Sequence, residues 1–427
     1  MDFGTSDNPA VQAQLDRLAQ LSIPEGRFGL ETIRALMDRL GDPQDRLPPV
    51  FHVAGTNGKG SVCAFLRAML EAGGKRVHVA TSPHLVRYNE RIRIAGNLIE
   101  DSLLAELLAE VLDTGADLSP SFFEVTIAAT FLAFARYPAD ACVIEVGLGG
   151  RFDATNVIAR PTICGIASLG IDHERFLLAP EDGTPNDPIA RIAFEKAGIA
   201  KPGVPLATSS YPEAAILEVE RAALAKQAPL LVRGRDWLAD IRDAIHYSDR
   251  HGRLLLPLPK MPGVHQGENA ALAVAMLRHQ DRVTISTAAM AEGIQSACWP
   301  ARLQKLSSGP LTQTRAVWLD GGHNRDAGNA IARHFAGKRL HLIIGMIVGK
   351  DPAAIIEPLQ PSLASITAVP ITTHDSHPAS AYAADRGSAP SVGQAISALP
   401  DDGLPVLIAG SLYLAGDVLR ANGEAPD

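Results

Sequence analysis

The sequence has few cysteine residues, few aromatic residues and no long apolar run. Its 427 residues include 4 cysteines and 5% Phe, Trp and Tyr. The cysteines are scattered and form no C-x-x-C pair, which fits a reducing compartment better than secretion. No run approaches the ~20 apolar residues of a membrane span, and residues 1–10 contain neither a basic nor an apolar signal region. We therefore predict a cytoplasmic protein without a membrane partner, and we expect Cys63, Cys142 and Cys164 to be small core residues.

An excess of positive charge is also missing. The sequence has 39 Lys and Arg against 47 Asp and Glu, a formal net charge of −8. A protein that coats nucleic acid needs a basic surface, so we expect no nucleic-acid partner. The share of hydrophobic residues, 46%, is typical of a globular protein. The length exceeds that of one ordinary core and indicates two or more domains.

The most informative stretch covers residues 49–73. A β-rich run, 50–54, ends in the turn Gly-Thr-Asn-Gly-Lys-Gly-Ser, 55–61, and a helical pattern follows. Free N–H groups at a helix start bind anions, Lys59 adds a charge for the β- and γ-phosphates, and Ser61 offers an oxygen to Mg²⁺. The common phosphate loop reads G-x-x-x-x-G-K-[ST], whereas here a glycine separates Lys from Ser. The alternative is a glycine-rich loop without a ligand, but the order of strand, loop, Lys, Ser and helix favours a nucleotide site.

Three charged or metal-binding side chains stand near the ends of predicted elements. Glu145 is the acidic residue of the apolar strand 141–147, so it either pairs with an arginine or binds Mg²⁺. His173 follows a strand at 162–168 and is either structural or a metal ligand. Lys196, near the end of a helix at 188–198, would by itself be a partner of the helix dipole.

The alternation of strands and helices predicts an α/β fold with mostly parallel sheets. A composition shift near 298–300 places a domain boundary at about 300, giving domains 1–299 and 300–427. Helices are expected at 9–22, 29–40, 122–135 and 268–277, with a loop at 24–29 between the first two. Strands are expected at 76–80, 316–319, 340–346, 366–371 and 406–409. The segment 204–256 is predicted to form two β/α units and a hairpin.

These motifs resemble those of the folylpolyglutamate synthase/dihydrofolate synthase family of the Mur ligase superfamily. The matching segments are AGTNGKGS (54–61), TSPHLVRYNERIRI (81–94), FFE (122–124), VIEVGLGGRFDATN (143–156), DH (172–173), EKAGI (195–199), DGGHNRDAG (320–328), GMIVGKD (345–351) and GSLYLAG (410–416). Three segments depart from the family pattern: WPARLQ (299–304), DGGHN (320–324) and the long loop 177–187. The resemblance implies an N-terminal P-loop ATPase domain of the Mur ligase type and a smaller Rossmann-like C-terminal domain.

The resemblance also implies a reaction. L-Glutamate would be joined to dihydropteroate and to folate polyglutamates, with ATP cleaved and an acyl phosphate formed. It implies Mg²⁺ at two sites, K⁺ as a further cation, a CO₂-derived carbamate on Lys196, and a monomer. Two other ligases remain as alternatives, one restricted to polyglutamylation and one acting on UDP-linked peptides. A nucleotide-binding switch without ligase chemistry is the alternative from another class.

The family's functional residues carry over onto matching positions. Catalytic roles fall on Lys59, Glu145, His173 and Lys196. ATP would contact Thr56, Asn57, Gly58, Lys59, Gly60, Ser61, Asn269, Arg302, Asp320 and His323. Mg²⁺ would be held by Ser82, Glu145 and His173, with Ser61 as a further candidate. The pterin substrate would contact Gly29, Leu30, Glu31, Phe122, Phe123, Glu124, Phe152, Asp153 and Ala154, although Phe122 and Phe123 could equally be ordinary core residues.

Overall fold

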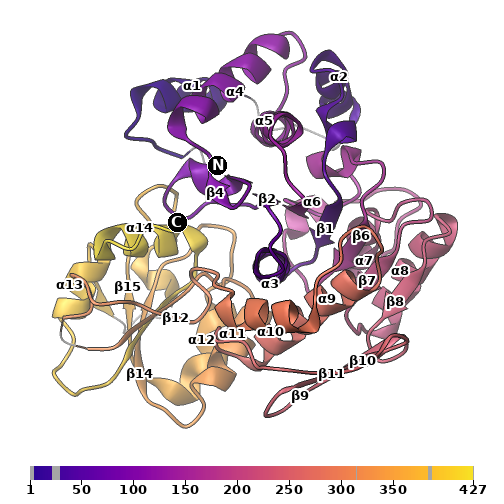
Figure 1. The fold of residues 1–427 in the computed structure, drawn as a ribbon. Coiled ribbons are helices and arrows are strands. Elements are labelled where there is room, and N and C mark those ends of the chain that lie inside the picture. The colour runs from indigo at the N-terminus through magenta and orange to yellow at the C-terminus, as the bar shows by residue number, and fades with distance from the viewer. Residues whose placement is uncertain (1–3, 22–28, 314, 383–386, 427) are drawn as a thin grey trace.

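The structure is a computed structural model that describes residues 4–21, 29–313, 315–382 and 387–426. Most of the predicted loop 24–29 therefore lies outside the described residues. Two sheets, each with helices on both faces, dominate the fold (Figure 1). We call the part from α1 to α10 the N-terminal lobe and the part from β12 to α14 the C-terminal lobe. The predicted α/β class is confirmed.

An eight-stranded sheet forms the centre of the N-terminal lobe, in the order β4-β3-β2-β5-β1-β6-β7-β8. Its pairs are parallel from β2 to β8, whereas β3 and β4 form an antiparallel edge. The strands are β1 (Val50–Ala54), β2 (Val77–Ala80), β3 (Ile92–Ile94), β4 (Asn97–Leu98), β5 (Ala141–Glu145), β6 (Ile163–Ile166), β7 (Leu206–Thr208) and β8 (Leu230–Val232).

Alternation along β1 divides the apolar core into two layers. Phe51 and Val53 belong to the cluster that includes α3, α9 and α10, while Val50 belongs to the cluster of α1, α2, α4 and α5. Helices α7 and α8 cover β6 and β7. The helices are α1 (Pro9–Ala19), α2 (Glu31–Arg39), α3 (Lys59–Ala72), α4 (Asp101–Thr114), α5 (Phe122–Arg136), α6 (Glu174–Leu177), α7 (Pro188–Ala197), α8 (Glu213–Ala225), α9 (Val264–Arg278) and α10 (Thr287–Ser296). The predicted burial of Cys63, Cys142 and Cys164 is confirmed.

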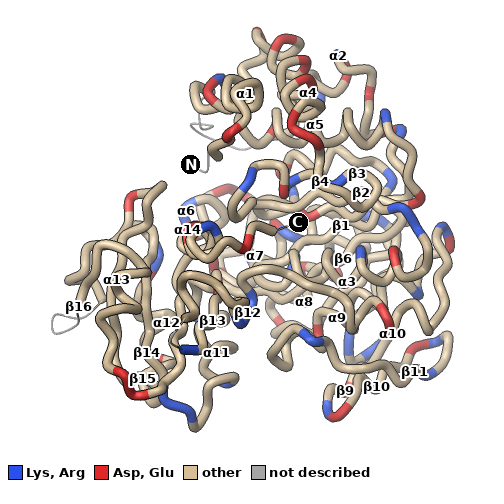
Figure 2. The backbone as a smooth tube through the Cα atoms, turned by 60° about the vertical axis from the view of Figure 1, so that its left-hand side comes forward, with Lys and Arg blue, Asp and Glu red and all other residues tan. Residues whose placement is uncertain are grey.

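The prediction for residues 204–256 is wrong in part. One unit, β7-α8-β8, is present, and a three-stranded antiparallel sheet follows it: β9 (Trp237–Ile241), β10 (Ile245–Asp249) and β11 (Gly252–Leu256). Buried Ile245 and Tyr247 alternate with exposed His246, a period of two that suits a half-covered antiparallel sheet. The connections between these strands are too short to hold a helix. The sheet lies at the opposite end of the lobe from α1 and α4 (Figure 2).

The C-terminal lobe is built on a six-stranded sheet in the order β12-β13-β17-β14-β15-β16, parallel except for the β12–β13 pair. Its strands are β12 (Gln304–Lys305), β13 (Val317–Asp320), β14 (Leu340–Ile344), β15 (Leu363–Ala368), β16 (Gly387–Ser388) and β17 (Val406–Ala409). Its helices are α11 (Arg325–His334), α12 (Ala353–Leu359), α13 (Val392–Ser397) and α14 (Leu412–Asn422). In the described ranges, no helix is both long and apolar enough to cross a bilayer.

Short 3₁₀ turns complete the fold: η1 (Pro43–Arg46), η2 (Tyr88–Arg91), η3 (Ala154–Val157), η4 (Gln360–Ser362) and η5 (Ala379–Tyr382). The carboxyl ends of β1, β5 and β6 are adjacent, because these three strands are parallel neighbours. The loops that leave them carry the phosphate loop and the motifs around Glu145 and His173. This edge is where open α/β sheets place their ligands.

Candidate active site

The phosphate loop runs from β1 into α3, which begins at Lys59. Gly58 takes a left-handed conformation, φ 84°, and a Cβ there would lie 2.5 Å from the Asn269 Oδ1. Thr56 Oγ1 donates to the Gly170 carbonyl over 2.9 Å, which ties the loop to the segment after β6. Ser61 is buried in the first turn of α3.

Gly60 is the extra glycine between Lys59 and Ser61. A Cβ at this position would lie 2.6 Å from the Trp299 indole, so any larger residue would collide with that ring. Trp299 belongs to the segment between the lobes, which the sequence flagged as a departure from the family pattern. The Trp299 ring therefore leaves no space for a side chain at position 60.

Asn269 and Gln266 stand beside the phosphate loop on α9. The Asn269 Nδ2 donates to the Gln266 Oε1 over 3.2 Å. Gln266 is buried, and its Nε2 has no hydrogen-bond partner among the described residues. A buried donor without a partner is costly, so this amide fits a ligand at the loop.

Glu145 ends β5 with a buried carboxylate that accepts a hydrogen bond from the Ser82 N–H over 3.2 Å. Burial raises its pKa above the ordinary value, while the charges of Lys59 and, more weakly, Arg302 act in the opposite direction. A carboxylate has about four acceptor positions, and the Ser82 amide uses one of them. The structure thus brings the predicted metal ligands Glu145 and Ser82 into contact. Carboxylate and hydroxyl oxygens suit a hard cation such as Mg²⁺.

His173 follows the loop after β6 and has a left-handed backbone, φ 54°. Burial lowers its pKa to about 4, and the charge of Asp172 opposes this shift. The imidazole is therefore neutral at pH 7, the form that binds metals. Among the residues that the structure describes, no group of three His, Cys, Asp or Glu side chains gathers to hold a metal ion. The Glu145–Ser82 pair is the part of the predicted metal set that is in direct contact.

Lys196 lies in the last turn of α7 and is 4% exposed. Burial lowers its pKa to about 7, and the charge of Lys59 adds to this effect, while Asp172, Asp153 and Glu195 oppose it. Its position near Lys59 excludes the simple role of a helix-dipole partner in solvent. A lysine with such a pKa is in part a neutral, nucleophilic amine at pH 7.

An ion network supports the helix end that carries Lys196. The Arg151 guanidinium contacts Glu195 at 2.8 Å and also pairs with Glu181 of the long loop 177–187. Arg191 contacts Glu181 and Glu195, each at 3.1 Å. The loop that looked unusually long in the sequence therefore supplies a carboxylate to this network.

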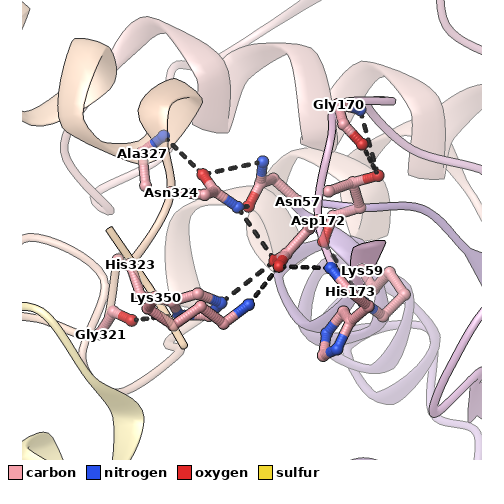
Figure 3. Close-up of polar contacts among 12 residues, drawn as sticks. Asn57, Lys59, Gly170, Asp172, His173, Gly321, His323, Asn324, Ala327 and Lys350 are labelled. Carbon is pink, nitrogen blue, oxygen red and sulfur yellow. Dashed lines mark hydrogen bonds and ion pairs between the residues drawn. The ribbon is translucent and has the colours of Figure 1, made fainter. Parts of the chain in front are cut away.

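The two lobes meet at Asp172 (Figure 3). This carboxylate pairs with Lys350 and lies 3.2 Å from the His323 Nε2 and 3.3 Å from the Asn324 Nδ2. Asn324 also donates to the Asn57 Oδ1 of the phosphate loop over 3.0 Å. Residues of the C-terminal lobe thus reach the loop that is predicted to bind ATP.

Arg302 lies where the chain passes between the lobes, and Asp320 ends β13 beside it. The residues on either side of Arg302 have left-handed backbones, φ 56° at Ala301 and 45° at Leu303. The Asp320 carboxylate stabilises this bend by accepting the Leu303 N–H over 2.8 Å. Two strained residues that flank a third are costly, and such strain is typical of functional sites.

Of the predicted pterin contacts, four share one apolar cluster: Leu30, Phe122, Phe123 and Ala154. A small cavity beside this cluster is lined by Phe123, Ser82 and Glu145, which connects it to the predicted metal ligands. Gly29 is adjacent to this cluster, but the exposed Glu31 side chain folds back over Gly29.

The remaining predicted contacts are engaged elsewhere. The Glu124 carboxylate accepts the Ser121 N–H and hydroxyl at 2.8 Å each, which caps α5. Phe152 lies under the Arg151 guanidinium, 4.2 Å from the ring centre. Asp153 is buried and hydrogen-bonded to its own loop.

No family model matches the chain. The dihydrofolate synthase/folylpolyglutamate synthase of Bacillus subtilis is 33% identical over 432 positions, which cover 92% of this chain and 94% of that protein. The chain belongs to the dihydrofolate synthase/folylpolyglutamate synthase family. E. coli FolC in complex with DHPP and ADP has a TM-score of 0.85 and 32% identity, covering 97% of each chain. A bifunctional enzyme solved with Mn, AMPPNP and L-glutamate bound has a TM-score of 0.84 and 28% identity, covering 97% of this chain and 99% of that one.

The resemblance inferred from the motifs is therefore confirmed, while the role of each residue stays a prediction. Several residues that lie in or against this candidate site were not among those predicted from the sequence: Asp172, Gln266, Trp299, Asn324 and Lys350. Lys350 lies in the loop that follows β14 (Leu340–Ile344), so its place beyond a strand end was the available signal. Trp299 gave none, because its contact with Gly60 exists only in the folded chain.

Proposed function

We propose that this protein is an ATP-dependent ligase that joins L-glutamate to dihydropteroate and to reduced folate polyglutamates. The observation that carries the proposal is the convergence of Lys59, Glu145, His173 and Lys196 at one strand edge, opposite Lys350 of the C-terminal lobe. Family membership supports the reaction. The E. coli relative binds DHPP and ADP, and another relative binds Mn, AMPPNP and L-glutamate.

The N-terminal lobe holds ATP in this proposal. The amides at residues 56–61 and the Lys59 ammonium bind the β- and γ-phosphates, and Asn269 and Gln266 face the nucleotide from α9. Arg302 contacts it from the segment between the lobes, and Asp320 contacts it from the end of β13 in the C-terminal lobe. Glu145, Ser82 and His173 hold Mg²⁺, which neutralises phosphate charge when it is bound.

The acceptor's carboxylate attacks the γ-phosphorus, ADP leaves, and an acyl phosphate results. The glutamate amine then attacks the acyl carbon, and phosphate leaves. Because water would hydrolyse the acyl phosphate, the contacts between Asp172, His323 and Lys350 serve to close the site. A carbamate on Lys196 would replace the positive charge of the lysine with a negative charge, which could support a second Mg²⁺.

The wall beside the metal ligands takes the pterin ring. Phe122, Phe123, Leu30 and Ala154 offer an apolar and aromatic surface, which suits a flat heterocycle. This wall reaches the metal ligands, because Phe123 and Glu145 line the same small cavity. A domain boundary near 300, a monomeric state, a cytoplasmic location and a K⁺ site belong to the same proposal.

Phosphate release from ATP tests the proposal. We expect release with Mg²⁺, L-glutamate and either dihydropteroate or tetrahydrofolate, and none when the acceptor is omitted. Release with tetrahydrofolate alone would indicate polyglutamylation only. Release with UDP-muramoyl peptides, or ATP cleavage that no acceptor changes, would contradict the proposal.

A further inference from the structure

His52 is a buried histidine in the middle of β1, and no predicted step uses it. It is fully buried, and its Nε2 lies 2.9 Å from the Thr155 Oγ1 at the far end of the motif after β5. Thr155 is also fully buried, and its hydroxyl contacts the Asp153 carboxylate. Three polar side chains thus connect the strand of the phosphate loop to the segment 147–156, which we call the acceptor loop.

The direction of each hydrogen bond in this chain follows from chemistry. The Asp153 carboxylate accepts two backbone N–H groups and the Thr155 hydroxyl. Because that hydroxyl donates its proton to Asp153, it must accept from the His52 Nε2–H. The His52 Nδ1 has no partner among the described residues, which fits an unprotonated nitrogen. Burial lowers the pKa of His52 to about 3, and the Lys201 charge adds to the effect. The imidazole therefore stays neutral and the direction of the chain is fixed.

The Asp153 carboxylate links the two ends of the acceptor loop. It accepts the Leu148 N–H over 2.8 Å and the Thr155 N–H over 3.0 Å. With the Thr155 hydroxyl, the protein itself occupies three of about four acceptor positions. Asp153 therefore bonds mainly within its own loop, and its carboxylate acts by shaping that loop.

The shaped loop meets the aromatic wall. A Cβ on Gly147 would lie 2.3 Å from the Phe123 ring, so the loop backbone and this ring are in tight contact. Ala154 belongs to the same apolar cluster as Phe123. A shift of the loop would displace Phe123 and open the wall of the proposed pterin site.

We propose that His52 and Thr155 are positioning residues that fix the acceptor loop against Phe123 and hold it in register with the phosphate loop. This inference rests on the proposed function, because the pterin site is itself a proposal. His52 lies on the strand that leads directly into the phosphate loop, so one element places both substrates. The alternative is that these hydrogen bonds only stabilise the core and have no effect on the binding of the acceptor.

Thr155→Val tests the inference, with Thr155→Ser as its matched control. Valine has nearly the same shape but cannot bridge His52 and Asp153, whereas serine can. We expect Thr155→Val to raise the KM for dihydropteroate about tenfold, the equivalent of one hydrogen bond to a charged group. The KM for ATP should stay unchanged, and Thr155→Ser should stay within about twofold of wild type. An unchanged acceptor KM, or an equal rise in both KM values, would overturn the inference.

A double variant keeps the test decisive if Thr155→Val folds poorly. In His52→Leu/Thr155→Val both partners are apolar, so no buried donor is left unpaired and thermal stability should return toward that of wild type. The acceptor KM should nevertheless remain raised. Recovery of both stability and acceptor KM would show a purely structural role. The wild type is assayed in parallel, because failure of the wild type to use any folate acceptor would reject the proposed function rather than this inference.

Discussion

Asp172 and Lys350 form an ion pair across the two lobes (Figure 3). Burial is the largest single influence on the pKa of Asp172 and would raise it. The hydrogen bond to His323 and the charge of Lys350 outweigh burial, and they lower the pKa below its ordinary range. Asp172 is therefore a permanent anion that the C-terminal lobe neutralises. This pairing makes lobe closure depend on charge.

Lys350→Ala is the first prediction. The substitution removes the ammonium group that pairs with the buried Asp172 carboxylate. Breaking a buried ion pair in this way destabilises the paired state by on the order of 3 kcal/mol. We expect the lobes to separate, with a larger radius of gyration in X-ray scattering without nucleotide and turnover reduced by at least about 10-fold. Lys338→Ala, an exposed lysine of the same lobe, is the control. An unchanged radius and unchanged turnover would show that the pair does not hold the lobes together.

Gly60→Ala is the second prediction, and it tests the contact with Trp299. The added methyl group would meet the indole at 2.6 Å, and overpacking of this kind costs about 1–3 kcal/mol. We expect weaker ATP binding and a lower melting temperature, both measured on the purified protein. Gly387→Ala is the matched control, because no atom of the described residues lies within 4 Å of a Cβ there.

A second substitution separates the steric effect from an effect on the backbone. In Gly60→Ala/Trp299→Ala the indole is absent, so the methyl group has space. The double variant should bind ATP better than Gly60→Ala does. If the two variants bind ATP equally weakly, Trp299 is not the reason for glycine at this position.

The sequence predicted local features of the fold well and long-range contacts poorly. The bounds of β1 and of β17 were predicted correctly, because each is a short apolar run followed by glycine. A second β/α unit was predicted within 204–256, where the structure has the antiparallel strands β9, β10 and β11. In the sequence, the short apolar runs of these strands look like those of a parallel β/α unit. The antiparallel pairing of β10 with both β9 and β11 distinguishes the two arrangements, and it is visible only in the structure.

The candidate site divides in the same way. Lys59 was found in the glycine-rich turn between β1 and α3, and Glu145 was found at the end of β5. Both signals are local in the chain. The pair formed by Asp172 and Lys350 spans 178 positions, and no pattern near either residue indicates the other. Gly60 was noticed in the sequence as an unusual glycine. The side chain that excludes a larger residue there is Trp299, which lies 239 positions later in the chain (299 minus 60).

Glu145→Gln is the third prediction. Burial raises the pKa of this carboxylic acid, so its ionisation destabilises the folded state as the pH rises through that pKa above 4.5. Glutamine removes this penalty at pH 7, and we expect the variant without metal to melt at or above the wild-type temperature. Affinity for Mg²⁺ should fall by at least about 10- to 100-fold, with turnover lost.

Differential scanning calorimetry with and without Mg²⁺ and ATP provides the measurement. Wild type should gain stability when both ligands are added, since they bind the folded state. Glu145→Gln should gain clearly less. An equal gain in the two proteins would remove Glu145 from the metal site, while leaving the phosphate loop as an ATP site.

Lys196 gives the fourth prediction, which concerns pH and CO₂. Only a neutral amine reacts with CO₂, and a pKa of about 7 makes the side chain roughly one-tenth neutral at pH 6 and nine-tenths neutral at pH 8. We therefore expect bicarbonate to stimulate turnover increasingly between pH 6 and 8 and to a constant extent above. Lys196→Met should abolish both turnover and the bicarbonate effect, whereas Lys260→Met, at an exposed lysine, should change neither.

The stability of the folded protein provides an independent readout of the same pKa. Because the folded-state pKa of Lys196 is lowered from 10.5 to about 7, the unfolded chain binds one proton more between these pH values. The destabilising effect of the buried charge is complete below pH 7 and fades as the pH rises toward 10.5. Wild type should therefore gain stability relative to Lys196→Met across this window, as measured by urea unfolding without bicarbonate. Parallel pH curves for the two proteins would mean that Lys196 titrates like a lysine in water, and the carbamate would then lack the neutral amine from which it forms.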